Sequence, residues 1–550
     1  MFKKFFLKRF FNQSINNITV AAALVALSSL TSRLLGVVRD RILAGRFNAG
    51  TTLDIYYAAF RIPDLIFNLI VLGALSAGFI PIFSSLIKNK ASDRKNGQKE
   101  NQEAWQLASN VANSLLISLI ALSLIGIIFA PQLVKIIAPG FGVSEQQSTV
   151  ALTRIMFLSP IFLGMSGILG GILQSFKKFF VYSLAPIFYN IGIIIGALYF
   201  VDIFGITGLA WGVVLGAALH FLIQLPAVYN LGFKYSFVLN WKNEKLRKIG
   251  KMMVPRTMSL AISQINLVVI TIIASTLPSG SLTAFNFANN LQSFPVGIFG
   301  ISFAIAAFPS LAENAHNKEK LTQHFSSTMR QILFFIIPAT ILIIALRAQI
   351  VRVILGTGNF DWRATFMTMD ALGFFTISIF AQATIPLVTR VFYALHNSRT
   401  PFYFGLVSIV INIILSFYLG KLMGVAGLAL AFSVANILNL ILLSFWLYVK
   451  VGTLDFNKIM FSSLKFIAAA IAAGITAQIM KVVVWPYIDM TKFSGVFTQL
   501  VASFGSGVLV YAWFCYLLNS EEFFWFIDAL KNRWPFKKVK VGDQGEARGV

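Results

Sequence analysis

The 550-residue sequence predicts an all-α polytopic membrane protein, and three observations carry this prediction. Hydrophobic residues make up 57% of the chain, charged residues only 12%, and the mean hydropathy is +0.78. Apolar runs of about 20 residues, the length that an α-helix needs to cross a bilayer, recur from end to end. These runs are continuous and do not alternate with a period of two, which excludes a β-barrel.

The ~20-residue requirement predicts about fourteen spans. Loops rich in Lys and Arg alternate with loops that are nearly uncharged, such as "FNAGTTLD" and "LPSGS". Because cytoplasmic loops collect positive charge, this alternation predicts an even number of spans with both termini in the cytoplasm. The expected span centres lie near Leu27, Leu69, Leu119, Leu163, Ile193, Leu215, Val268, Ile298, Ile337, Ile379, Val410, Ile437, Ala470 and Val508.

The excess of basic residues has the same explanation. The formal net charge is +25, but we expect no nucleic-acid partner, because loop residues that obey the positive-inside rule account for it. Residues 1–17 read as a basic amphipathic segment on the inner leaflet, and 521–550 as a basic cytoplasmic tail. The single cysteine, Cys515, excludes an internal disulfide framework, and no metal-binding spacing of Cys and His occurs.

Three internal sequence matches occur in the same order in the two halves of the chain. "GITGLAWG" returns as "GVAGLALA", "LQSFKKF" corresponds to "LHNSRTP", and "APIFYNIGIIIG" corresponds to "VSIVINIILSFY", which aligns Asn190 with Asn412. We therefore expect two six-helix lobes, 18–230 and 246–450, followed by two further helices within 458–520. Transporters built from such repeats bind substrate near the membrane midplane, between the halves.

The sequence favours a transporter over an enzyme. The phosphate-binding pattern G-x-x-x-x-G-K-[ST] is absent, and no loop is long enough for an ATPase domain. No Ser/His/Asp set or carboxylate pair is placed for catalysis. We therefore expect translocation by alternating access, with no cofactor.

Charged residues inside the first expected span indicate the chemistry of the substrate. Arg33 and Arg39 are about 9 Å apart along a helix, with Gly36 between them as a candidate hinge. Ser32 shares a helix face with Arg39, as Arg33 does with Asp40. A charge at this depth is costly and is kept for function, whereas Arg41 and Arg46 fit the outer flank of the span.

The second and eighth spans add further polar residues. Asp54, Arg61 and Pro63 lie in the second span, where a proline bends the helix and accompanies a cavity. An excess of guanidinium groups in a membrane cavity predicts a phosphate or carboxylate ligand. In the eighth span, the amides of Asn286, Asn289 and Asn290 suit sugar or peptide groups, or hydrogen bonds between helices.

The stretch "SRLLGVVRDRILAGRFNAGTTLDIYYAAFRIPDLIFNLIVLGALSAGFIP" resembles the MurJ (MviN) family of lipid II flippases, as do "SFPVGIFGISFAIAAFPSL" and "FYALHNSRTPF". The resemblance implies a MATE-like fold and transport of lipid-linked peptidoglycan precursor across the bacterial cytoplasmic membrane. It implies a cationic cavity for the pyrophosphate and an apolar groove for the polyprenyl tail, formed with 458–520. The family's polar positions in the first two spans correspond to Ser32, Arg33, Arg39, Asp40, Asp54 and Pro63.

The chain departs from the family pattern where Phe67 and Asn290 replace expected arginines, which Arg61 partly compensates. Ser416, one turn after Asn412, is not the acid that sodium coupling would favour, so coupling to a monovalent ion or to the membrane potential stays open. We expect a monomer among membrane lipids. Three other functions stay open: a flippase for another polyprenyl-pyrophosphate glycan, a MATE-type exporter, and a scaffold without transport.

Overall fold

The computed structural model describes residues 18–72, 78–88 and 97–533, and these residues form helices and connecting turns without any strand. Within this part of the chain, ten helices are long and apolar enough to cross a membrane. A bent pair, Trp362–Thr376 and Ile379–Ala394, raises the number to eleven if it forms one span with a 44° bend. The chain is a multi-pass helical membrane protein, as predicted.

The expected span centres agree with these helices. Eleven of the fourteen centres fall within the ten helices and the bent pair. The other three, Leu27, Leu69 and Val268, lie in helices whose side chains are described only in part. The N-terminal segment 1–17 and most of the tail 521–550 lie outside the described residues.

Contacts divide the chain into two compact units. Unit 1 comprises Met1–Phe294, Arg347–Ser378 and Arg399–Asn439, and unit 2 comprises Pro295–Leu346, Ile379–Ser398 and Leu440–Val550. The expected lobe boundaries, 18–230 and 246–450, remain predictions. Two long helices, α16 (Lys318–Leu355) and α20 (Val425–Val451), contribute residues to both units.

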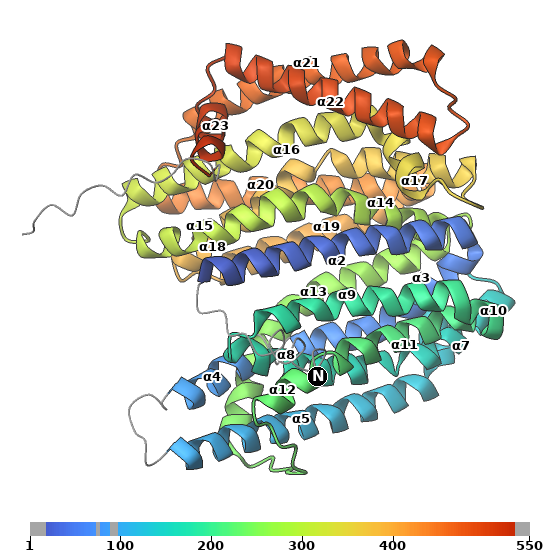
Figure 1. The fold of residues 1–550 in the computed structure, drawn as a ribbon, viewed down its shortest axis with the longest axis vertical. Coiled ribbons are helices and arrows are strands. Elements are labelled where there is room, and N and C mark those ends of the chain that lie inside the picture. The colour runs from blue at the N-terminus through green and yellow to red at the C-terminus, as the bar shows by residue number, and fades with distance from the viewer. Residues whose placement is uncertain (1–17, 73–77, 89–96, 534–550) are drawn as a thin grey trace, which may run out of the picture. The chain divides into compact units, whose positions relative to one another are not determined.

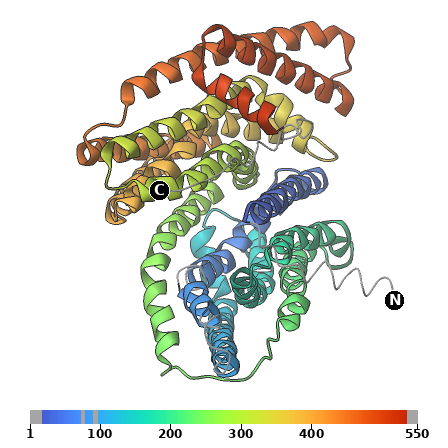
Figure 2. The ribbon, with the colours of Figure 1, turned by 60° about the vertical axis from the view of Figure 1, so that its left-hand side comes forward.

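Most helices of unit 1 come from the first half of the chain (Figure 1). Among them, α2 packs against α9, α8 against α11, and α13 against α19. Asn110 and Asn113 of α5 hold the extended segment 231–243 by hydrogen bonds to its backbone; Figure 2 shows this segment between α12 and α13. The elements are α2 (Ile18–Phe47), α3 (Thr51–Ile66), η1 (Phe67–Leu72), α4 (Ile80–Lys88), α5 (Gly97–Ile128), α6 (Ala130–Ile137), α7 (Val143–Met156), α8 (Ser159–Ser175), α9 (Phe179–Ile195), η4 (Gly196–Phe200), α10 (Val201–Phe204), α11 (Thr207–Leu222), α12 (Leu225–Asn230), α13 (Glu244–Ser275), α14 (Ser281–Pro295), α17 (Trp362–Thr376) and α19 (Arg399–Met423).

Unit 2 contains the two helices that follow the repeats, α21 and α22, which pack side by side as an antiparallel pair (Figure 1). Gly474 and Gly507 permit close packing, because a Cβ at either position would lie within 3 Å of a side chain of α16. The elements are η5 (Val296–Ile301), α15 (Ser302–Glu313), α18 (Ile379–Ala394), α21 (Phe456–Val484), η6 (Trp485–Tyr487), α22 (Phe493–Leu517) and α23 (Glu521–Arg533).

The turns at the repeated motifs have the same backbone geometry. Gly205 and Gly424 both have φ +61°, a left-handed conformation that glycine adopts without strain. Lys177 and His396 also share a positive φ, 58° and 54°, each in the turn of the second repeated motif. The two glycines lie at the same position of their motif, as an internal repeat requires, whereas Lys177 is the fifth residue of its motif and His396 the second.

A change of helix type follows the proline of the second span. Pro63 is buried in α3, and the π-helical segment η1 begins four residues later. In the eighth span, Pro295 ends α14 and η5 follows at once. Such π-helical turns are frequent at functional sites, and the hinge at Pro63 stays a prediction. The other candidate hinge, Gly36, lies within the uninterrupted helix α2.

Candidate functional site

The first two spans place a group of charged side chains inside unit 1, here called the charged cluster: Arg39, Asp40 and Arg61. Arg39 contacts Asp40, its neighbour in sequence, with Nη2 and Oδ1 2.8 Å apart. Asp40 is 7% exposed and Arg39 22% exposed, so the pair is largely shielded from solvent. Asn290 of α14 donates to the second oxygen of Asp40 at 2.8 Å. The pair is thus neutral overall and ties α2 to α14.

Arg39 also reaches α9. Its Nη1 donates to Oδ1 of Asn190 at 3.1 Å, and the amide of Asn190 donates in turn to Oγ of Ser32 at 3.5 Å. Ser32 and Arg39 share a helix face, as their seven-residue spacing predicts, and both meet the same asparagine. Asn190 therefore fixes the direction in which α2 presents its guanidinium.

Arg61 differs from Arg39 because its partners are uncharged. Its Nε donates to Oγ1 of Thr271 at 2.9 Å, and its Nη2 donates to Oδ1 of Asn286 at 2.8 Å. Within the described residues, no carboxylate lies within the 4.0 Å limit for an ion pair with Arg61. Asp64, one helical turn further along α3, interacts electrostatically with Arg61 although the two form no ion pair. The half-buried guanidinium is thus oriented by neutral partners and only partly compensated by a carboxylate.

Asp54, predicted to bind substrate, contacts the start of α14. Its carboxylate is 4% exposed and accepts from the backbone N–H groups of Gly280 and Thr283, at 2.6 and 2.8 Å, and from the Thr283 hydroxyl. These groups form the N-terminus of α14, where a carboxylate satisfies free N–H donors and complements the helix dipole. Asp54 therefore positions α14, and both of its oxygens are already occupied.

Arg33 lies outside the charged cluster. It is exposed, and no hydrogen bond or ion pair links it to another described residue. Arg33 and Arg39 are six residues apart, about 240° around a helix, so they point in different directions. Asn289 lies next to Asn290 on α14 but lines a separate cavity of the same unit.

Two arginines that the sequence assigned to the outer flank of the first span bind backbone oxygens. Arg41 donates to the carbonyls of Val353 and Ile354, at the C-terminal end of α16. Arg46 donates to the carbonyl of Ala197 and forms an ion pair with Asp202. Both therefore complete helix ends, where free carbonyls favour cations.

Several residues of the site were not predicted from the sequence. Asn190 could have been found from the repeat, which aligned it with Asn412 without assigning it a role. Thr271 and Thr283 gave no signal, because a threonine in an apolar helix usually bonds its own backbone. Phe67, at a position where the family pattern has arginine, packs against the apolar core around Phe79 and Phe83.

Metal chemistry has no candidate among the described residues. No group of three or more His, Cys, Asp or Glu side chains gathers in this part of the chain. The imidazole of His220 makes a close polar contact instead, with its Nδ1 2.6 Å from the Ser166 hydroxyl. That contact joins α8 to α11 and suits a structural role.

Unit 2 holds an apolar groove of about 470 Å³. Its walls come from α16, α18, α20 and α21, and its few polar groups are hydroxyls such as those of Thr340, Thr384 and Ser463. This volume is typical of a site for a small ligand. An acyl or isoprenoid segment matches the groove chemically, because no charged side chain lines it. The lining residues include Phe325, Met329, Leu333, Ile337, Phe380, Leu440, Phe456 and Ile467.

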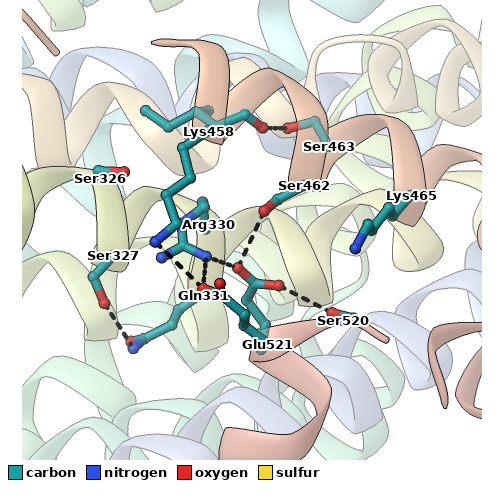
Figure 3. A network of polar contacts seen from close by, with 12 residues as sticks. Ser326, Ser327, Arg330, Gln331, Lys458, Ser462, Ser463, Lys465, Ser520 and Glu521 are labelled. Carbon is teal, nitrogen blue, oxygen red and sulfur yellow. Dashed lines mark hydrogen bonds and ion pairs between the residues drawn. The ribbon is translucent and has the colours of Figure 1, made fainter. Parts of the chain in front are cut away.

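A second group of charges lies in unit 2, and Figure 3 shows it as a network across α16, α21 and α23. Arg330, 10% exposed, pairs with Glu522 and, at 3.0 Å, with Glu521. Glu522 also accepts from the hydroxyls of Ser462 and Ser520, at 3.3 and 2.9 Å. A hydrogen bond from Arg330 lowers the pKa of the Glu521 carboxyl. This network, here called the ionic network, anchors α23 to the helices that line the groove.

Sequence comparisons identify the relatives of this chain. The model of the family described as lipid II flippase MurJ matches residues 43–498. A probable lipid II flippase MurJ from Buchnera aphidicola subsp. Acyrthosiphon pisum is 30% identical over 430 residues, which cover 77% of this chain and 82% of the relative. A lipid II flippase MurJ from Burkholderia cenocepacia is 27% identical over 434 residues, covering 76% of this chain and 82% of the relative.

Solved structures show the same fold. A lipid II flippase MurJ in an inward closed conformation aligns with a TM-score of 0.73 at 24% identity, covering 92% of this chain and all of that one. An inward-facing multidrug resistance MATE family transporter aligns with a TM-score of 0.61 at 17% identity, covering 77% and 95%. The MATE-like fold predicted from the sequence is confirmed.

Proposed function

The chain belongs to the lipid II flippase MurJ family, and we propose that it moves lipid II from the inner to the outer leaflet of a bacterial cytoplasmic membrane. The curated relatives are named for this activity. Such a substrate has three chemically distinct parts: a pyrophosphate, a neutral glycan with a peptide, and a long apolar tail. A flippase must bind a charged headgroup inside the membrane and release it on the other side.

The observation that carries the proposal is the state of Arg61. Its guanidinium is bound by a hydroxyl and an amide oxygen, and Asp64 interacts with it only at a distance beyond an ion pair, so its charge is not fully neutralised. A buried charge of this kind is costly unless a partner of opposite charge arrives. Pyrophosphate suits it, because guanidinium binds phosphate oxygens through parallel hydrogen bonds. A cationic drug would be repelled, which disfavours the MATE-type exporter.

The neutral pair Arg39–Asp40 supports the same proposal. An arriving anion would compete with Asp40 for Arg39, and Asn290 would keep Asp40 hydrogen-bonded while this happens. The exchange would lower the cost of both binding and release, because neither charge is left bare. A transporter needs such an exchange, since tight one-way binding would stop turnover.

The apolar groove of unit 2 is the proposed site of the polyprenyl tail. It is lined by apolar side chains and offers no charge. Its volume of about 470 Å³ is that of a pocket for a drug-sized ligand, so it would hold a segment of the tail while the rest stays among membrane lipids. The protein would then need to shield only the headgroup during the crossing.

Alternating access and an orientation with both termini in the cytoplasm complete the proposal. The orientation is inferred from the charge of the loops, and two exposed positions test it: Lys242 in a basic loop and Ser279 in an uncharged loop. A cysteine at Lys242 should react with an impermeant label from the cytoplasm, and one at Ser279 from outside. The native Cys515 is buried, so it gives little background. If the Ser279 position were labelled from the cytoplasm alone, the orientation of the protein, and with it the direction of transport, would be the reverse of the one proposed.

Reconstitution tests the activity. Purified protein in liposomes should expose lipid II to an impermeant reagent outside far faster than protein-free liposomes do. A lipid-linked glycan with a different sugar sequence and a cationic dye form the two comparison arms. Transport of the dye without movement of lipid II would overturn the proposal, and equal movement of both glycan lipids would make the chain a general polyprenyl-pyrophosphate flippase.

A further inference from the structure

A second cavity lies within unit 1, between α13, α14, α19 and α20, and its lining differs from that of the groove. Its volume is about 390 Å³. Asparagine side chains from all four helices line it, and no acidic or basic residue does. We call it the amide chamber and define it by Asn266, Asn289, Asn412, Asn436, Asn439 and Ser408.

Two helices separate the amide chamber from the charged cluster. On α14, Asn286 and Asn290 bond to Arg61 and Asp40, while the residues just before them, Phe285 and Asn289, line the chamber. On α13, Thr271 bonds to Arg61, and the preceding Ile270 lines the chamber. Consecutive residues point about 100° apart on a helix, so each helix serves both sites. The two sites are therefore neighbours.

The chamber contains hydrogen-bonding groups that the protein leaves available. The Oδ1 atom of Asn439 is buried and has no hydrogen-bond partner among the described residues. The amide of Asn436 donates only to the Phe432 carbonyl of its own helix, at 2.9 Å. By contrast, Asn412 donates to Asn266 at 2.8 Å and joins α19 to α13. A buried amide without a partner is costly, so its presence in a cavity points to a ligand.

The lining determines the class of ligand. The lining carries no fixed charge for a charged ligand, whereas its amides offer both donors and acceptors to hydroxyl and N-acetyl groups. The rings of Phe285 and Phe432 add flat apolar walls, which suit the apolar face of a sugar ring. We propose that the amide chamber binds the neutral glycan of the lipid-linked headgroup, an inference that rests on the proposed function.

Binding of three lipids by the full-length protein tests this inference: polyprenyl diphosphate, its glycan-bearing form without the peptide, and lipid II. The variant Asn436→Leu/Asn439→Leu removes chamber amides that bridge no helices. Each lost hydrogen bond should cost roughly three- to tenfold in affinity, so both glycan lipids should bind about 10- to 100-fold more weakly. Polyprenyl diphosphate should bind as to the wild type, which also shows that the variant folds. Asn230→Leu, at an exposed asparagine outside the chamber, is the matched control.

Three outcomes would overturn the inference. Unchanged affinity for the glycan lipids would leave the chamber without a ligand. Equal weakening for all three lipids would make it a packing feature, and weakening for lipid II alone would assign it to the peptide. A wild-type protein that binds none of the three lipids would refute the proposed function itself, and the inference with it.

Discussion

Arg61 in unit 1 and Arg330 in unit 2 are both arginines withdrawn from solvent, yet their surroundings differ in charge. Arg330 faces two carboxylates, those of Glu521 and Glu522, and completes a neutral network. Arg61 faces a hydroxyl and an amide oxygen, which orient it, and Asp64 interacts with it without forming an ion pair. The first arrangement suits a role in stability, whereas we propose that the second keeps a charge available for an anion. Depth in the membrane alone therefore does not identify a ligand-binding arginine; its partners do.

The largest effect on stability should follow from breaking the ionic network. Arg330→Ala leaves the carboxylate of Glu522, 6% exposed, buried without a counter-charge. Removing one member of a buried ion pair costs about 3–5 kcal/mol, so the thermal unfolding midpoint in detergent should fall sharply. Lys465→Ala, an exposed lysine of the same region, should change it little. A stable Arg330→Ala protein that has lost lipid binding would assign Arg330 to the substrate.

A variant of Asp54 distinguishes a role in positioning α14 from a role in binding substrate. Asp54→Ala leaves the N–H groups of Gly280 and Thr283 without an acceptor at the start of α14, at a cost of about 1–3 kcal/mol. The unfolding midpoint should fall, and lipid affinity per folded molecule should stay close to that of the wild type. The opposite result, full stability with lost affinity, would restore Asp54 to the substrate-binding residues.

Asn290→Arg should sharpen the contrast between a neutralised arginine and one available to an anion, because it adds a second arginine beside Asp40. The new guanidinium would take the oxygen that Asn290 now contacts, and Arg39 would become freer to bind an anion. Polyprenyl diphosphate should bind about fivefold more tightly, a change of roughly 1 kcal/mol, and its release should slow. Weaker binding would mean that Asp40 must stay free of a second cation.

The smallest effect concerns pH. The pKa of Glu521 is lowered by its bond to Arg330, so this group stabilises the protein above its usual pKa of about 4.3 and loses that contribution as pH falls through the lowered value. Glu521 is 68% exposed, which keeps the contribution below about 1 kcal/mol. Glu521→Gln should therefore unfold slightly earlier than the wild type at pH 7, and the difference should vanish in acid. A difference that grows in acid would contradict this assignment.

The sequence predicted the spans and the repeat because both depend on local composition and on turns that need special backbone geometry, such as those at Gly205 and Gly424. It also located the charged residues of the first two spans. It could not rank them, because the direction of a side chain depends on which helices pack around it. Arg33 and Arg39 look alike in the sequence, but only Arg39 contacts Asn190 and Asp40. The neutral partners of Arg61 come from residues more than 200 positions away, beyond the reach of any local pattern.

We propose that the guanidinium of Arg61, which forms no ion pair within the described residues, binds the pyrophosphate of the substrate, and the affinity of the purified protein for polyprenyl diphosphate tests this most directly. A charge-assisted hydrogen bond contributes about 1.5–3 kcal/mol, so Arg61→Ala should bind roughly 10- to 100-fold more weakly while its unfolding midpoint stays near that of the wild type. Arg61→Lys should recover part of the loss, since it keeps the charge without the planar fork. Arg154→Ala, at an exposed arginine of α7, is the matched control. Wild-type affinity in Arg61→Ala, or equal loss in Arg154→Ala, would contradict the claim.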